Sequence, residues 1–291
     1  MARELYFQHA YPVSALARAF AVSRSAIYYE AVSPSEEAAA EEREIQKEIE
    51  ISHKESGESY GTRKIKKDLA AKGYQVSRRY ISRVMKDKEL ASTYTRKSYR
   101  PQKGKTNESL VSNTLARKYD GRKPYEVVVS DLTYVQVRFT WYYICILIDL
   151  FNREIIGYSI GSKHDSSLVI KAFYTVRTDL SRISLFHSDR GSEFTGKKLN
   201  TLLDTFGIRR SLSQKGCPYD NAVAEATFKS IKTEFVRGRV FDSEEELKNH
   251  FDEYVYWYNH LRRHGALGYE SPVSYRRAYE EANREESNII F

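Results

Sequence analysis

The feature that most constrains the fold is an apolar run that begins just after Tyr125. Val127, Val128 and Val129 form the near-continuous run typical of a strand buried on both faces, and the run ends at Asp131. The elements expected after it are a β-rich segment at Val135, strands at 141–148, 155–160, 184–186 and 208–212, and helices at 165–180, 197–205, 220–237 and 243–261. Strands in succession, followed by alternating helices and strands, predict an α/β fold with a mixed sheet and flanking helices.

Positive charge is concentrated in one block of the chain. The whole chain of 291 residues has a net charge of +8, but residues 1–59 carry −5, residues 60–124 carry +14 and residues 125–291 carry −1. Such a concentration of charge suits a polyanion such as nucleic acid, through phosphate contacts and the release of counterions. A solvated basic surface would give the same arithmetic, so charge alone leaves both interpretations open.

The chain before this apolar run has helical patterns. Residues 11–29 have the spacing of a helix-turn-helix with a Ser23 cap, and residues 36–53 indicate a polar helix. A second pair of helices follows, in which Ser77 caps the second helix and leaves arginines on its exposed side. A short turn before an Arg-bearing helix is typical of recognition in the major groove, although a small basic bundle without that role fits too. The candidate DNA-binding residues here are Arg63, Lys64, Arg78, Arg79 and Arg83.

Composition excludes several classes of protein. Only Cys145 and Cys217 occur, so neither a disulfide framework nor a zinc site built on cysteines can form. No segment has the roughly 18 apolar residues of a membrane helix, and no secretion signal is visible. We therefore expect a soluble cytoplasmic protein with no membrane partner.

Three acidic residues lie next to apolar segments, where burial of a negative charge costs free energy. Asp131 and Asp189 each follow an apolar segment, and Glu225 lies at the edge of the apolar stripe of a predicted helix. Converging carboxylates repel one another, and a hard divalent cation such as Mg²⁺ relieves that repulsion. Taken singly, each acid is more often a cap or a solvated residue, and Asp149 and Glu193 occupy similar positions. Chemistry alone therefore does not select the three.

The spacing and the neighbouring residues resemble a known family. Asp131 lies in Ser-Asp-Leu-Thr-Tyr, Asp189 in His-Ser-Asp-Arg-Gly, and 35 residues separate Asp189 from Glu225. This pattern resembles the Asp-Asp-Glu signature of transposases and retroviral-type integrases with a ribonuclease H-like core. Two further motifs are similar to the second-frame (OrfB) proteins of the IS3 family of bacterial insertion sequences. One contains Tyr258, Asn259, Arg262 and His264, and the other is the short motif that starts at Tyr60.

The resemblance implies a function and roles for single residues. Asp131, Asp189 and Glu225 would be catalytic residues that bind two Mg²⁺ ions, with Mn²⁺ as a substitute. The protein would bind the terminal inverted repeats of its element, cut one strand, and join the freed 3′-hydroxyl to target DNA. It would act as a dimer or larger homo-oligomer on double-stranded DNA, near the nucleoid. The further DNA contacts implied are Lys229, Lys232, Arg262 and His264.

Some alternatives stay open. Family members are often frameshift fusions with an upstream-frame (OrfA) segment, which would make OrfA a partner of this chain. A non-catalytic DNA-binding regulator and a ribonuclease H-like nuclease that hydrolyses without joining are the rival functions. Tyr258 and His264 fit packing of a C-terminal helix on the core as well as a place near the active site. The expected organisation is a helix-turn-helix at 1–32, a polar helix at 33–58, a second helix-turn-helix at 59–95, a basic linker at 96–122, the ribonuclease H-like domain at 123–276 and a tail at 277–291.

Overall fold

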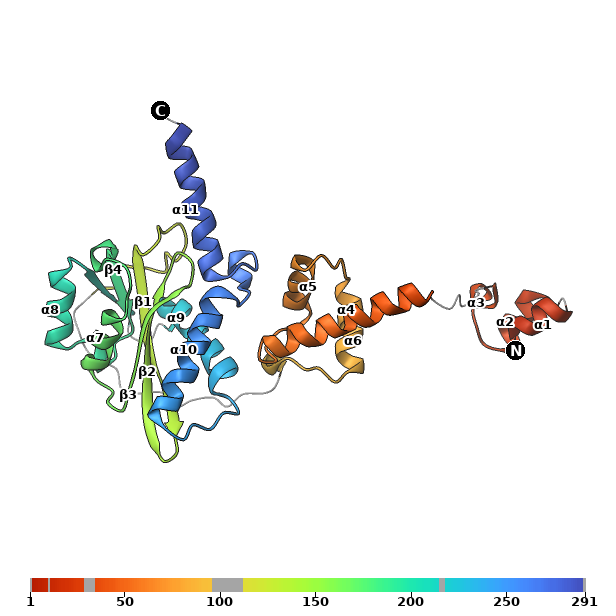
Figure 1. The fold of residues 1–291 in the computed structure, drawn as a ribbon, viewed down its shortest axis with the longest axis horizontal. Coiled ribbons are helices and arrows are strands. Elements are labelled where there is room, and N and C mark those ends of the chain that lie inside the picture. Colours follow the sequence, from red (N-terminus) through yellow and green to blue (C-terminus); the bar gives the residue numbers. More distant parts are fainter. Residues whose placement is uncertain (1, 10, 29–34, 96–111, 215–217, 290–291) are drawn as a thin grey trace. The chain divides into compact units, whose positions relative to one another are not determined.

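The computed structural model describes residues 2–9, 11–28, 35–95, 112–214 and 218–289 (Figure 1). Its contacts divide the chain into two compact units, Met1–Glu48 and Ile49–Phe291. Cys217 and residues 96–111 of the predicted linker lie outside the described residues. No helix in the described ranges is long and apolar enough to cross a membrane.

A five-stranded mixed sheet forms the centre of the second unit. Its strand order is β3-β2-β1-β4-β5; β1, β2 and β3 are antiparallel, whereas β4 and β5 run parallel to β1. This confirms the predicted α/β class. The strands are β1 (Val127–Val137), β2 (Thr140–Asp149), β3 (Ile155–Gly161), β4 (Leu185–Ser188) and β5 (Arg209–Leu212).

Helices cover both faces of the sheet, as Figure 1 shows. Helices α7 (Ser166–Tyr174) and α8 (Lys197–Thr205) pack on one face, and α9 (Ala222–Ile231) and α10 (Glu244–His260) pack on the other. Because side chains alternate along a strand, Val127 and Val129 join the core under α9 and α10, while Val128 joins the core under α7 and α8. The apolar run is therefore continuous because both faces of β1 are buried.

Strand β1 is longer than the sequence indicates. We expected it to end at Asp131, but it continues to Val137 because β2 pairs with it along its whole length, as far as Val137↔Thr140. On its other edge, β4 pairs only with Val127–Val129. The exposed side chains of Tyr134 and Gln136 interrupt the apolar pattern and hide this continuation. Asp131 thus lies inside β1, just past the point where the pairing of β1 with β4 ends.

The N-terminal helices agree with the predictions except for α1, which the sequence pattern does not indicate. The first unit contains α1 (Ala2–His9), α2 (Val13–Ala19), α3 (Arg24–Tyr28) and the start of α4 (Glu36–Glu55). Helices α5 (Thr62–Ala71) and α6 (Arg78–Asp87) belong to the second unit. The Ser77 hydroxyl caps α6 by accepting the Tyr80 N–H at 3.1 Å, as predicted.

The C-terminal helices differ from expectation in two places. The single helix predicted at 220–237 is α9 followed by one π-helical turn, η5 (Lys232–Val236). Helix α11 (Pro272–Ile289) passes through residue 276, so the predicted tail begins inside a helix. Short 3₁₀ turns are η1 (Thr93–Thr95), η2 (Leu180–Arg182), η3 (Ser192–Phe194), η4 (Pro218–Asn221) and η6 (Gly265–Leu267).

Candidate active site

The register of two parallel strands places Asp131 beside Asp189. Val129 of β1 pairs with His187 of β4, and each aspartate lies two residues beyond its member of that pair. A step of two residues keeps a side chain on the same face of the sheet, and neighbouring strands lie about 4.8 Å apart. The two carboxylates therefore lie next to each other, where β4 has ended and β1 continues.

Each aspartate uses one carboxylate oxygen to accept a backbone N–H close to it in the chain. Oδ1 of Asp131 accepts the N–H of Leu132 at 2.8 Å, and Oδ1 of Asp189 accepts the N–H of Gly191 at 2.9 Å. His187 lies just before this turn and is fully buried, with hydrogen bonds to Ser211 and Ser213. His187 therefore anchors the end of β4 to β5.

Glu225 lies in the first turn of α9 and is exposed. The start of this helix is tied to β1, because the side-chain amide of Asn221 donates to the carbonyl of Ser130 at 3.3 Å. Asp220 in the same turn is buried and accepts bonds from Asn113 and Arg117. These contacts hold the helix that carries Glu225 against the strand that carries Asp131.

Electrostatic coupling connects the three acids. Burial, and then the negative charge of Asp189, raises the pKa of Asp131 to about 8. Burial also raises the pKa of Asp189. The pKa of Glu225 is raised by burial and then by the charge of Asp189. Asp189 is thus close enough to both other acids to disfavour their ionised forms.

The donor set of this site suits a hard divalent cation. Carboxylate oxygens are the ligands that Mg²⁺ prefers, and a cation would stabilise the ionised carboxylates, which burial and then repulsion between the acids disfavour. Within the part of the chain that the structure describes, no three His, Cys, Asp or Glu side chains are close enough to hold one metal ion. The chemistry of Asp131, Asp189 and Glu225 fits the ion, while their spacing here is wider than that of a formed chelate.

The structure separates the two other candidate acids. Asp149 is fully buried, and its carboxylate accepts the N–H groups of Tyr125 at 2.8 Å and Phe151 at 3.0 Å, so it stabilises the turn after β2. Glu193 is also buried, and its negative charge acts to raise the pKa of Asp131, while burial and then the charge of Asp189 raise the pKa of Glu193 itself. Glu193 is therefore a further carboxylate of the site.

His164 is a site residue that the sequence does not indicate. Its Nε2 lies 3.4 Å from Oε1 of Glu193, and its charge acts to lower the pKa of Asp189. It lies in the polar loop after β3, without a motif or periodicity around it. A lone histidine in such a loop carries no recognisable pattern, so only the folded chain brings it to the carboxylates.

Two lysines lie on the same helical segment as Glu225. Lys229 and Lys232 are exposed, and the Nζ of Lys232 lies 5.5 Å from the centre of the Tyr134 ring on β1. The charge of Lys232 acts to lower the pKa of Asp131. The structure thus places Lys232 close to Asp131, and its predicted contact with DNA stays a prediction.

The predicted DNA-binding residues of α5 and α6 have different surroundings. Arg63 in α5 and the three α6 arginines, Arg78, Arg79 and Arg83, are exposed, opposite a buried face. Lys64 is partly buried, with its Nζ 4.9 Å from the centre of the Tyr60 ring, and burial lowers its pKa to about 8. The four arginines are therefore accessible to solvent, whereas Lys64 is partly covered by the core.

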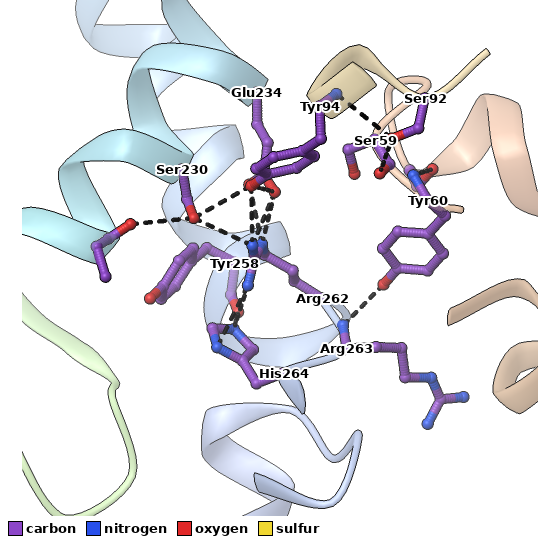
Figure 2. A network of polar contacts seen from close by, with 12 residues as sticks. Ser59, Tyr60, Ser92, Tyr94, Ser230, Glu234, Tyr258, Arg262, Arg263 and His264 are labelled. Atoms are coloured by element: carbon purple, nitrogen blue, oxygen red, sulfur yellow. Dashed lines mark hydrogen bonds and ion pairs between the residues drawn. The ribbon is translucent and has the colours of Figure 1, made fainter. Parts of the chain in front are cut away.

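The structure gives Arg262 and His264 a role other than the predicted DNA contact. Both are buried, and Nη2 and Nε of Arg262 donate to the carboxylate of Glu234 at 2.8 to 3.0 Å (Figure 2). His264 packs edge-on against the buried Tyr258, with ring centres 4.7 Å apart. This confirms the packing interpretation, because groups buried and bonded in this way stabilise the C-terminal part of the core.

Protonation of His264 is expected to destabilise the fold in mild acid. Burial, and then the positive charges of Arg262 and Lys64, lower its pKa from 6.5 to about 2. The unfolded chain therefore binds more protons between these values, so the contribution of this residue to stability is lost as the pH falls below about 6.5, by up to about 1.4 kcal/mol per pH unit.

Urea unfolding between pH 5 and 7 measures this slope. His264→Gln should reduce it, whereas His260→Gln, which replaces an exposed histidine, should leave it unchanged. An equal slope in wild type and His264→Gln would contradict the prediction.

Comparisons with known proteins agree with this architecture. Two segments, 121–218 and 225–279, match models of the integrase core domain, and residues 39–98 match an HTH-like domain. The 31 kDa protein of insertion element IS600 from Shigella sonnei is 32% identical over 91% of this chain and 99% of its own length. InsK of IS150 from Escherichia coli K12 is 31% identical over 91% and 94%, and the transposase InsF of IS3A from the same strain is 29% identical over 76% and 77%.

A solved structure also aligns with the core. The HTLV-2 integrase catalytic core domain in complex with magnesium is 16% identical, covers 53% of this chain and 97% of its own, and has a TM-score of 0.42. The matches with the insertion-sequence proteins span almost the entire chain, including both the helical N-terminal part and the sheet. The chain belongs to the family of IS3-type insertion-sequence transposases with an integrase core.

Proposed function

We propose that this transposase binds the terminal inverted repeats of its element and catalyses metal-dependent strand cleavage and 3′-hydroxyl strand transfer. The observation that carries the proposal is the register of β1 and β4, which puts Asp131 beside Asp189, with Glu225 electrostatically coupled to Asp189. A protein that only occupied DNA would have no use for acids held at such a cost in repulsion.

The residues of the site supply binding and charge. Asp131, Asp189 and Glu225 would hold Mg²⁺ ions, or Mn²⁺ in their place, which when bound activate the attacking oxygen and stabilise the leaving oxygen at phosphorus. Lys229 and Lys232 would attract the phosphates of the scissile strand, because both ammonium groups are exposed on the segment that carries Glu225. Water serves as nucleophile for cleavage and the freed 3′-hydroxyl for joining, and each displaces one oxygen from phosphorus, so one site suffices for both steps.

The exposed arginines of α6 would supply much of the affinity for DNA. Arg79→Ala should weaken binding to an element-end duplex and reduce the salt dependence of the dissociation constant by about one ion. The rate of cleavage at saturating DNA should change little. Arg177→Ala, which removes an exposed arginine from the loop after α7, is the matched control. Titration by fluorescence anisotropy at several salt concentrations tests this, and unchanged affinity in Arg79→Ala would remove the recognition role from α6.

An oligonucleotide assay tests the proposed reaction. Labelled duplexes that carry the ends of the element are incubated with the protein and Mg²⁺, and the products are separated by strand length. Strands longer than the substrate show joining, whereas shortened strands alone show the ribonuclease H-like alternative. Binding without either product in both Mg²⁺ and Mn²⁺ would leave a non-catalytic regulator.

The reaction also sets the assembly that we propose. Two element ends must be held together for transfer, so a dimer or larger homo-oligomer is expected on DNA. An OrfA protein from the upstream frame is a further proposed partner, because relatives of this family are often made as fusions with it. Sedimentation of the protein with and without end duplexes measures its oligomeric state.

A further inference from the structure

A buried carboxylate lies in the turn that directly follows α9, the helix that carries Glu225. The side chain of Glu234, in the π-turn η5, is only 2% exposed. It accepts hydrogen bonds from Arg262 and from the hydroxyl of Tyr94 at 2.6 Å (Figure 2). It also accepts one from the hydroxyl of Tyr254 at 2.9 Å. Burial of a carboxylate is costly unless its oxygens are fully bonded, and here the charge of Arg262 and these donors hold the pKa of Glu234 below its usual value.

The donors come from separate parts of the chain. Tyr254 belongs to α10 and Arg262 to the loop after it, so both are part of the catalytic domain. Tyr94 belongs to η1, at the end of the segment 59–95, which we call the DNA-binding module. Glu234 therefore connects this module with the C-terminal half of the catalytic domain.

Tyr94 reaches α9 by two routes. Its hydroxyl is 3.1 Å from the Oγ of Ser230, which lies in α9, in addition to its bond with Glu234 in the turn that follows. Burial, together with the charge of Glu234, raises the pKa of Tyr94 to about 12, so its hydroxyl keeps the proton that it donates. The polar end of Tyr94 is thus fixed on the segment that carries Glu225, Lys229 and Lys232.

The turn that carries Tyr94 is anchored on both sides. Within the module, the hydroxyl of Ser92 donates to the carbonyl of Ser59 at 2.8 Å. Towards the catalytic domain, Nη1 of Arg237 donates to the carbonyl of Thr93 at 3.1 Å, and the N–H of Arg263 donates to the Tyr60 hydroxyl at 2.7 Å. A shift of the DNA-binding module would therefore strain several hydrogen bonds to the catalytic domain, including those at η5.

The π-turn makes this position sensitive. A π-turn is rare and is frequently found at functional sites, because its wider spacing changes the direction of the residues that follow. Here it starts at Lys232, directly after α9, and Glu234 is its middle residue. The placement of Lys232 over Tyr134 therefore depends on a turn whose geometry is held by the bonds of Glu234 to Tyr94, Tyr254 and Arg262.

We propose that Tyr94 is a positioning residue for the catalytic helix, which acts through Glu234 and Ser230 to make the placement of Glu225 and Lys232 depend on the docked DNA-binding module. This inference rests on the proposed function, since it concerns how that active site is arranged. Tyr94 itself does not contact the reacting atoms.

Tyr94→Phe removes one hydroxyl and keeps the ring. Hydrogen–deuterium exchange of the full-length protein, without DNA or metal, should show amides of residues 226–236 exchanging about tenfold faster, as expected for loss of one hydrogen bond to a charged group. Tyr174→Phe, at an exposed tyrosine of α7, is the matched control and should exchange as wild type does. Unchanged exchange of residues 226–236 in Tyr94→Phe overturns the proposal.

A second readout separates positioning from mere stability. Nicking of a supercoiled plasmid in Mn²⁺ should be several-fold slower in Tyr94→Phe at saturating protein, with the same affinity for a duplex fragment and a melting temperature close to that of Tyr174→Phe. Faster exchange with an unchanged nicking rate would also overturn the proposal. If wild type does not nick at all, the proposed function fails, and the exchange measurement alone decides whether Tyr94 holds α9.

Discussion

Asp131→Asn is expected to slow strand cleavage and strand joining together by about 10³-fold. Asn keeps the size of the side chain but removes the charge that a divalent cation requires, and loss of about 4 kcal/mol of transition-state stabilisation corresponds to that factor. Both steps should fall equally because both use one site. Single-turnover rates on end duplexes in Mg²⁺, for cutting and for joining of pre-cut ends, measure the effect.

The affinity for DNA provides the internal check on this variant. Asp131→Asn should bind end duplexes as well as wild type, because the exposed arginines of α6 are unchanged. Asp204→Asn, at an exposed aspartate of α8, should retain full activity. Activity of Asp131→Asn close to that of wild type would rule out Asp131 as a catalytic ligand.

Arg262→Ala is expected to lower the free energy of unfolding by about 3–5 kcal/mol. Removing one partner of a buried ion pair leaves the other charge buried without compensation. Among the residues that the structure describes, Glu234 would then keep the hydroxyl donors of Tyr94 and Tyr254. Urea unfolding followed by tryptophan fluorescence measures the loss.

Two further variants define the cause of that loss. Lys248→Ala breaks the exposed pair with Glu244 on α10 and should cost less than about 0.5 kcal/mol, as exposed pairs do. The double change Arg262→Met with Glu234→Leu removes both charges and should recover most of the stability. If Arg262→Ala costs no more than Lys248→Ala, the loss of Arg262 does not leave Glu234 as an uncompensated buried charge.

The order of elements and the likeness of the site to a known family could be predicted from the sequence, because they depend on local patterns. The run Val127–Val129 predicts a strand buried on both faces, and the spacing of Asp131, Asp189 and Glu225 indicates their shared role. Ser77 predicts the start of α6 because a cap acts on the amides of the next turn. Each of these signals spans a few residues or a recognisable word.

The sequence by itself determined the α/β class and the family, and it predicts Asp131, Asp189 and Glu225 as the acids of the site. Only the tertiary structure decided that β1 continues past Asp131, that Asp149 stabilises a turn while His164 and Glu193 join the site, and that Arg262 is buried against Glu234. The physical reason is that the burial and pairing of a polar group depend on what another segment places beside it. Arg262 looks like a surface cation until the carboxylate of Glu234, 28 residues earlier, is brought against it.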